Sequence, residues 1–239
     1  MRSLASRCIS CIVLFTLFLS PAAGQEWSRF RGPNGTGESE TNTIPASWTD
    51  NELNWRVVLP GIGHSSPVLW GEKIFLLSAD PTSAERYVLC LNAKDGKEIW
   101  RRTYPGVPHH LHANSSFASV TPAVDAERVY VAWSDPEFTR LMALDHEGKE
   151  VWTVNLGSWI SQHGFGCSPM LYQDLVVLNC SQEDSKLPGQ PLPKECFIVA
   201  VEQSTGVVRW RTDRKIVSAS YSVPTVRKNE AGKEEIGRA

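Results

Sequence analysis

Short apolar runs recur along the chain, and each is followed by a polar turn and a second short segment that ends in Trp. The runs are YVLCLN, RLMALD and FIVAVE, at residues 87–92, 140–145 and 197–202, and DGKEIW, EGKEVW and TGVVRW follow them. Runs this short, rich in Val, Leu and Ile, are typical of strands rather than helices. We therefore expect each copy to form a strand, a tight turn and a second strand.

Each turn carries a glycine, and a tryptophan follows four residues later. Glycine allows a turn position with positive φ without steric cost, and a large aromatic ring repeated at one strand position favours packing between neighbouring sheets over chemistry. Trp55 has the same strand context, without partner strands before it. The turn glycines are Gly96, Gly148 and Gly206, and the repeated tryptophans are Trp55, Trp100, Trp152 and Trp210.

Two further short strands precede each run, so each unit is predicted to be a four-stranded antiparallel meander. Successive repeated tryptophans lie 45, 52 and 58 residues apart, which is in the range of propeller blades with variable loops. The sequence therefore predicts an all-β protein, an incomplete β-propeller with about three full blades and partial ones. Residues 54–60 are expected to form an orphan first strand, and the last unit begins near residue 220 without its final two strands. We expect a partial ring truncated at the C-terminus, with closure through self-association as the alternative.

Three segments are predicted from composition. Residues 1–24 carry two arginines, an apolar stretch and small residues before Gln25, which is the pattern of a signal peptide. The apolar stretch is shorter than the roughly 20 residues that span a membrane. We expect export to the periplasm or the extracellular space, with no integral membrane segment after cleavage; the alternative is an uncleaved anchor. Residues 25–51, rich in Gly, Asn, Ser and Thr, are expected to be irregular, and residues 52–239 to form the propeller repeats.

The charge and the cysteine content limit which classes of partner, disulfide and metal site we expect. The chain has 24 basic and 26 acidic residues, so no basic excess indicates a nucleic-acid partner. Export would permit disulfides. Cys180 and Cys196 lie at the ends of two predicted neighbouring strands and are a candidate disulfide; the alternative is that all four cysteines after the leader are small core residues. No C-x2-C pair indicates zinc.

The repeat resembles the pyrroloquinoline-quinone (PQQ) type propeller repeat. That signature is a small or acidic residue, a short turn ending in Thr-Gly, and a Trp four residues after the Gly. Residues 202–210 match it best, residues 92–100 have Asp95 in place of the usual Thr, and residues 145–152 have a turn one residue shorter. The resemblance runs roughly from Trp55 to the C-terminus, and it implies the fold of the quinoprotein alcohol dehydrogenase-like superfamily.

The resemblance implies two different functions. Some members are eight-bladed dehydrogenases that bind PQQ and calcium through two adjacent cysteines in a disulfide, a Trp plane, and Glu, Asn and Asp ligands. Another is a non-catalytic outer-membrane assembly lipoprotein that binds protein partners. No two cysteines are adjacent here, and no position matches the catalytic Asp by motif. We therefore predict a binding or scaffold protein without a cofactor and assign no catalytic residue; PQQ with calcium is expected only if the chain is a fragment of a quinoprotein oxidoreductase.

The connections between units carry the distinctive polar chemistry. In a propeller these connections gather on one face, and here they contain five of the six histidines. Imidazoles can bind a metal or an anion, but loop residues also commonly satisfy backbone groups. We predict no metal site and expect the connections to face a protein, peptide or glycan, with purely structural use as the alternative. The candidate ligand-binding residues are His64, His110, His112, Asn114, His163 and Tyr221.

Overall fold

The computed structural model describes residues 26–33, 35–161, 163–182, 195–215 and 219–238. The predicted signal peptide, most of the loop between residues 181 and 195, and part of the connection after residue 215 lie outside these ranges. Within them, no helix is long and apolar enough to cross a membrane.

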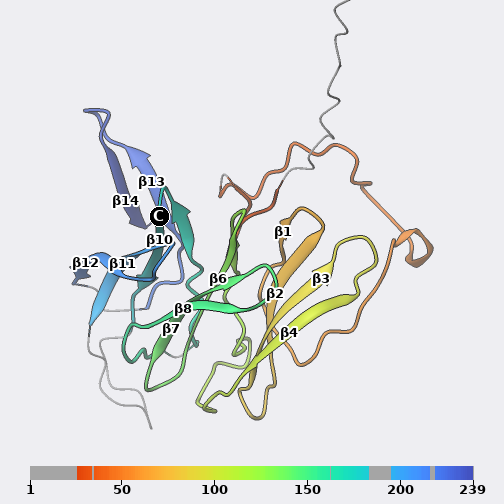
Figure 1. Cartoon of the computed structure of the whole chain (residues 1–239), viewed down its shortest axis with the longest axis horizontal. Coiled ribbons are helices and arrows are strands. Elements are labelled where there is room, and N and C mark those ends of the chain that lie inside the picture. The colour runs from red at the N-terminus through yellow and green to blue at the C-terminus, as the bar shows by residue number, and fades with distance from the viewer. Residues whose placement is uncertain (1–25, 34, 162, 183–194, 216–218, 239) are drawn as a thin grey trace, which may run out of the picture.

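The described chain forms three antiparallel sheets of four strands each, in sequence order, followed by a two-stranded hairpin (Figure 1). This confirms the predicted meanders and the incomplete propeller. A 3-10 turn, η1, covers Asp50–Glu52. The strands are β1 (Val68–Trp70), β2 (Lys73–Ala79), β3 (Arg86–Asn92) and β4 (Glu98–Tyr104); β5 (Ala123–Val124), β6 (Arg128–Ser134), β7 (Thr139–Asp145) and β8 (Glu150–Asn155); β9 (Met170–Tyr172), β10 (Leu175–Cys180), β11 (Cys196–Glu202) and β12 (Val208–Arg214); and β13 (Pro224–Lys228) with β14 (Glu234–Arg238).

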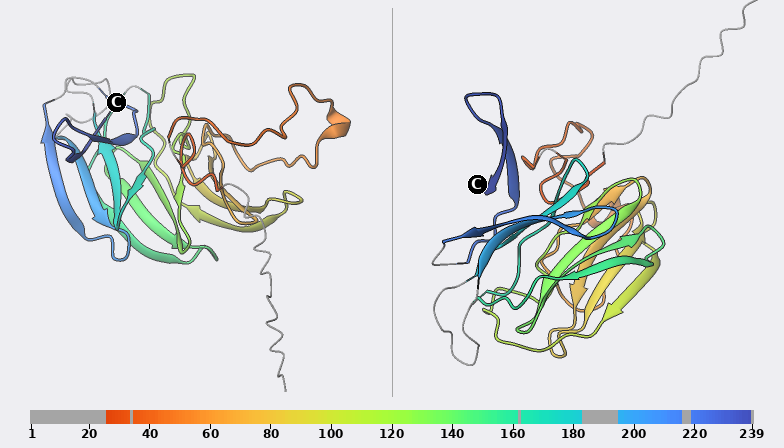
Figure 2. Two further views of the ribbon diagram at one scale, coloured as in Figure 1. Left: turned by 90° about the horizontal axis from the view of Figure 1, so that it is seen from above. Right: turned by 60° about the vertical axis from the view of Figure 1, so that its left-hand side comes forward.

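The two middle strands of each sheet are almost entirely buried because both of their faces are covered. Every residue of β10 is buried, and so are six of the seven in β6. The sheets lie one after another across the molecule, with the hairpin beside the third (Figure 2). One apolar core runs through all three sheets. A strand with two covered faces needs apolar residues at successive positions, which explains the continuous apolar runs in the sequence.

The repeated tryptophans connect each sheet to the next one. Three of the four lie against the turn glycine of the following unit, so that a Cβ on that glycine would approach the indole ring to between 2.5 and 2.8 Å. All three glycines have positive φ, between 71° and 78°. Glycine is therefore required at these positions for two reasons: the positive φ, and the indole ring that occupies the place of a Cβ. The pairs are Trp55 with Gly96, Trp100 with Gly148, and Trp152 with Gly206.

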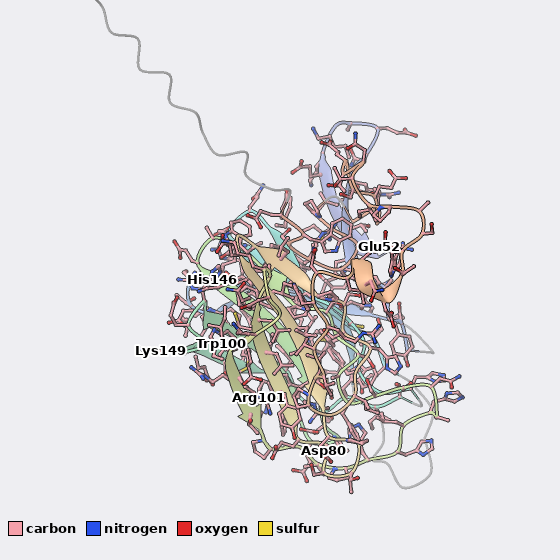
Figure 3. The ribbon with its side chains drawn as sticks, turned by 90° about the vertical axis from the view of Figure 1, so that its right-hand side faces the viewer. Glu52, Asp80, Trp100, Arg101, His146 and Lys149 are labelled. Carbon is pink, nitrogen blue, oxygen red and sulfur yellow. The ribbon has the colours of Figure 1, made fainter. Side chains whose placement is uncertain are left out.

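A hydrogen bond holds each of these rings in place. Trp100 Nε1 donates to the carbonyl of His146 at 2.8 Å, and the two residues lie together in Figure 3. The Arg102 side chain covers the same ring and donates from Nε to the Gly148 carbonyl at 2.6 Å. Equivalent bonds join Trp55 Nε1 to the Ala93 carbonyl and Trp152 Nε1 to the Gln203 carbonyl, at 2.9 and 2.8 Å. Trp210 in β12 packs instead beside the β13–β14 hairpin.

Two expectations about the chain are corrected by the structure. Residues 54–60 form no strand, although Trp55 reaches its place on Gly96. A strand needs a neighbouring ladder of backbone hydrogen bonds, and among the described residues none pairs with this segment, where Val58 is 93% exposed.

The candidate disulfide between Cys180 and Cys196 is not formed, and both are free thiols, like Cys90 and Cys167. The register of β10 and β11 places Cys180 opposite Phe197 rather than opposite Cys196. Neighbouring residues of a strand point to opposite faces of the sheet, so the two sulfur atoms are on opposite sides. Three of the four cysteines are buried, and Cys196 is half-buried.

The N-terminal segment, defined as residues 26–33 and 35–37, runs along the first strand of successive sheets. Trp27 forms an isolated bridge with Leu69 of β1, and the Ser28 carbonyl accepts a hydrogen bond from Val124 N of β5 at 2.8 Å. In Figure 2 the segment lies between the first two sheets and the β13–β14 hairpin. These contacts anchor the segment at the inner strands of the first two sheets.

Candidate functional site

The loops and the tight turns of the sheets lie on opposite faces of the molecule. Figure 3 shows Asp80, in the β2–β3 loop, and His146, in the β7–β8 turn, at opposite ends of the strands. The connections between sheets, β4–β5, β8–β9 and β12–β13, are on the same side as Asp80, because each sheet is a simple up-and-down meander. We call this side the loop face. It carries the irregular segments on which the sequence placed the candidate site.

A cavity of about 460 Å³ opens on the loop face. All three connections between sheets contribute to it, and so does the N-terminal segment, which the sequence did not place there. Its walls combine two aromatic rings, one imidazole, several hydroxyl groups and close-packed glycines. We call it the loop-face cavity. It is lined by Phe30, Ser115, Ser119, His163, Gly164, Gly166, Ser168, Tyr221 and Val223.

Two of the predicted residues, His163 and Tyr221, line this cavity, and a third, His112, packs beside His163. The rings of His112 and His163 are 5.0 Å apart, and the ring of Tyr221 stands edge-on to His163 at 6.1 Å. The Tyr221 hydroxyl is 2.9 Å from Ser161 Oγ, a buried hydroxyl on the same connection as His163. Asn114 contributes its backbone amide, which donates to Nδ1 of His112 at 3.2 Å. The result is a row of aromatic and polar rings along one wall.

Other predicted residues lie apart from this row. His64 Nδ1 is 3.0 Å from Ser116 Oγ, and His64 does not line the loop-face cavity. His110 is exposed on the β4–β5 connection. His109, a further histidine of this connection, packs edge-on against Phe117 at 5.0 Å, and burial lowers its pKa. Among the residues that the structure describes, no group of three or more His, Cys, Asp or Glu side chains could hold a metal ion.

A buried ion pair beneath the β4–β5 connection was not predicted from the sequence. Arg86 Nη1 is 2.9 Å from Asp135 Oδ1, and the two side chains are 3% and 0% exposed. Arg86 also donates to the Phe117 carbonyl at 3.2 Å, and Asp135 Oδ1 accepts from Val107 N at 3.3 Å. Burial lowers the pKa of Arg86, and the charge of Asp135 opposes that shift. The pair ties both ends of the connection to the first two sheets.

The chain has recognisable relatives at the level of family. Residues 84–226 match the profile of the family described as outer membrane protein assembly factor BamB, a PQQ-like repeat family. That range is more than half of the 239 residues. The chain belongs to this PQQ-like family. A search of curated proteins gives no match.

Solved structures of quinoproteins have the same fold as this PQQ-like chain. The quinohemoprotein alcohol dehydrogenase from Comamonas testosteroni matches with a TM-score of 0.54 and 18% identity over 80% of this chain and 28% of that one. Quinohemoprotein alcohol dehydrogenase ADHIIG from Pseudomonas putida HK5 matches with a TM-score of 0.52 and 20% identity, covering 79% and 26%. The PQQ-like chain thus spans about a quarter of their length, and these identities establish the fold alone.

The residues of the loop face do not fit the quinoprotein cofactor set. The resemblance implies adjacent cysteines, yet the four described cysteines are separate free thiols. Calcium requires oxygen ligands that usually include carboxylates, and no Asp or Glu is among the described residues that line the loop-face cavity. The cavity instead offers rings and hydroxyl groups, which suit packing and neutral hydrogen bonding.

Proposed function

We propose that this PQQ-like chain is an exported, non-catalytic binding protein that holds a protein, peptide or glycan partner at its loop face. The observation that carries the proposal is the loop-face cavity, where His163 and Tyr221 stand beside hydroxyl groups on connections anchored by packed sheets. Concave sites of this size, with apolar walls and a few placed polar groups, are typical of binding pockets. The family description as an assembly factor supports a scaffold role.

The binding test compares the two faces of the molecule. Purified protein is screened on arrays of bacterial glycans and of peptides, and each hit is measured by calorimetry. His163→Ala removes one ring of the cavity wall and should weaken the hits by about tenfold or more. Lys149→Ala, on the exposed opposite face (Figure 3), is the control and should change nothing. Ligands whose affinity is unchanged by His163→Ala, or is reduced by Lys149→Ala, would contradict the proposal.

The second candidate function is that of an enzyme: the chain would be a fragment of a quinoprotein oxidoreductase. The fold similarity to two quinohemoprotein alcohol dehydrogenases favours it. It is tested by adding PQQ and calcium to the protein and following dye reduction with ethanol as substrate. Saturable PQQ binding with alcohol oxidation would replace the binding-protein proposal. Neither binding nor oxidation is the expected result.

Export is tested separately by the N-terminus of the protein isolated from the producing cells. Cleavage after Gly24 leaves Gln25 as the first residue, which mass spectrometry identifies directly. A protein that keeps residues 1–24 and stays inside the cells would contradict the proposed export. This result does not depend on which partner is bound.

A further inference from the structure

Arg29 is a half-buried cation without a partner. Among the described residues, its guanidinium has no hydrogen bond and no ion pair, whereas the buried Arg86 has both. Burial lowers the pKa of Arg29, and no acidic neighbour opposes the shift. Arginine nevertheless stays charged in proteins. A desolvated, unpaired charge is costly, so its position suggests a use beyond stability.

Two further cavities are lined by Arg29. Their volumes are about 330 and 230 Å³, and both are lined by Arg29, Gly35 and Thr225. The smaller one is also lined by Arg31, and it shares Phe30, Tyr221 and Val223 with the loop-face cavity. The three cavities therefore adjoin one another along the N-terminal segment. No Asp or Glu is among the described residues lining any of them, so two arginines set the local potential.

The backbone around Arg29 is folded closely onto its side chain. Gly35 has a φ of +74°, and a Cβ at this position would lie 2.3 Å from Arg29 Nη2. Arg31, which is not a glycine, also has a positive φ of 64°. A backbone hydrogen bond from Gly32 N to the Arg29 carbonyl, at 2.9 Å, closes the turn. Such a conformation is strained for a residue with a side chain. The backbone of the segment is therefore constrained next to the Arg29 guanidinium.

We propose that Arg29 binds the carboxylate of an acidic sugar, a uronate, whose ring lies in the loop-face cavity against Phe30 and Tyr221. The inference rests on the proposed function and specifies its ligand class. The planar guanidinium matches a carboxylate through two parallel hydrogen bonds. Aromatic rings provide apolar surface for the C–H face of a sugar, and the hydroxyl groups of Ser119 and Ser168 suit sugar hydroxyls.

A sugar fits this place better than an extended peptide does. Peptides commonly bind by adding a strand to a free sheet edge. Here the N-terminal segment already uses part of the edge of the inner strands, through the Trp27 bridge to Leu69 and the bond from Val124 N to the Ser28 carbonyl. The loop-face cavity, of about 460 Å³, has room for a ligand of one or two sugar rings.

The test measures calorimetric binding of D-galacturonate and D-glucuronate against the neutral sugars D-galactose and D-glucose. The uronates should bind about tenfold or more tightly than their neutral counterparts, and added salt should weaken only the uronates. Arg29→Gln should abolish that preference, and Arg29→Lys should retain part of it. Arg56→Gln, which removes an exposed arginine paired with Asp50, is the matched control and should leave the preference unchanged.

Folding is monitored in parallel. Because Arg29 has no partner, Arg29→Gln should not lower the unfolding temperature; a clear drop would show that the arginine is structural and overturn the inference. Equal binding of acidic and neutral sugars would overturn it as well. Tighter binding of a Glu-containing tripeptide that still depends on Arg29 would replace the sugar with an acidic peptide. If the glycans or peptides found on the arrays lose affinity with His163→Ala while the uronates do not bind, the inference fails and the proposed function stands.

Discussion

Replacing Gly148 with alanine tests the contact that joins the first two sheets. In the structure Gly148 has a φ of +78°, and a new Cβ would lie 2.8 Å from Cδ2 of Trp100, within the body of the indole ring. The ring cannot easily move away, because Trp100 is 9% exposed and its Nε1 is bonded to the His146 carbonyl. The added methyl group therefore meets both a backbone cost and a packing cost.

The two costs are separated by a second glycine. Gly71 also has a positive φ, +58°, but no atom lies within 4 Å of the Cβ that alanine would add there. The left-handed backbone costs about 1–2 kcal/mol for an alanine, and overpacking a filled site costs about 1–3 kcal/mol more. Gly71→Ala should therefore lower the free energy of unfolding by about 1–2 kcal/mol, and Gly148→Ala by about 2–5 kcal/mol.

The assay is urea unfolding followed by tryptophan fluorescence and circular dichroism. Trp100→Leu is combined with Gly148→Ala, since a smaller side chain leaves room for the methyl group. The double variant should be less destabilised than the sum of the single variants by about 1 kcal/mol or more. Equal losses for Gly148→Ala and Gly71→Ala, with additive behaviour in the double variant, would refute the close packing of Trp100 on Gly148.

Three further predictions concern the loop face and the core. Asp135→Asn leaves Arg86 buried without its counter-charge and should cost about 3–5 kcal/mol in urea unfolding, whereas replacing both residues with Leu and Met should recover most of it; a small loss in the single variant would argue against the pair. Burial lowers the pKa of His109 below its ordinary 6.5, so its contribution to stability is complete above that pH and is lost as the pH falls towards the lowered value. Unfolding measured at pH 7.5 and 5.5 should show this loss in the native protein and a smaller one in His109→Gln. Burial raises the pKa of the Cys90 thiol to about 12, so Cys90 should stay unlabelled by Ellman's reagent at pH 8, with Cys196 labelled first when the sites are read by mass spectrometry.

Local sequence patterns predicted most of the strands, but they did not predict contacts between segments that are far apart in the sequence. The run at residues 197–202 is β11 almost to the residue, because a strand covered on both faces selects apolar residues locally. The same reasoning failed for residues 54–60, where the Trp motif is present but no neighbouring strand exists. It failed again for Cys180 and Cys196, because the two residues seemed opposite in a hairpin while the true register offsets them by one position.

The candidate site was only partly visible for a related reason. The sequence identified the connections that carry His112, His163 and Tyr221, but nothing in an irregular loop specifies which rings meet. Arg86 and Asp135 looked like ordinary polar residues until the first two sheets were packed together.

By itself the sequence determined the repeat: its strands, its glycine turns and the all-β meander of each unit, since these depend on residues that are neighbours along the chain. Only the tertiary structure decided which glycine each tryptophan covers, which histidines share a wall, and where the N-terminal segment with Arg29 lies. Those contacts join segments from different sheets, and their geometry is set by how whole sheets stack. A periodic pattern predicts the sheets, but it carries no information on the irregular connections that form the cavity between them.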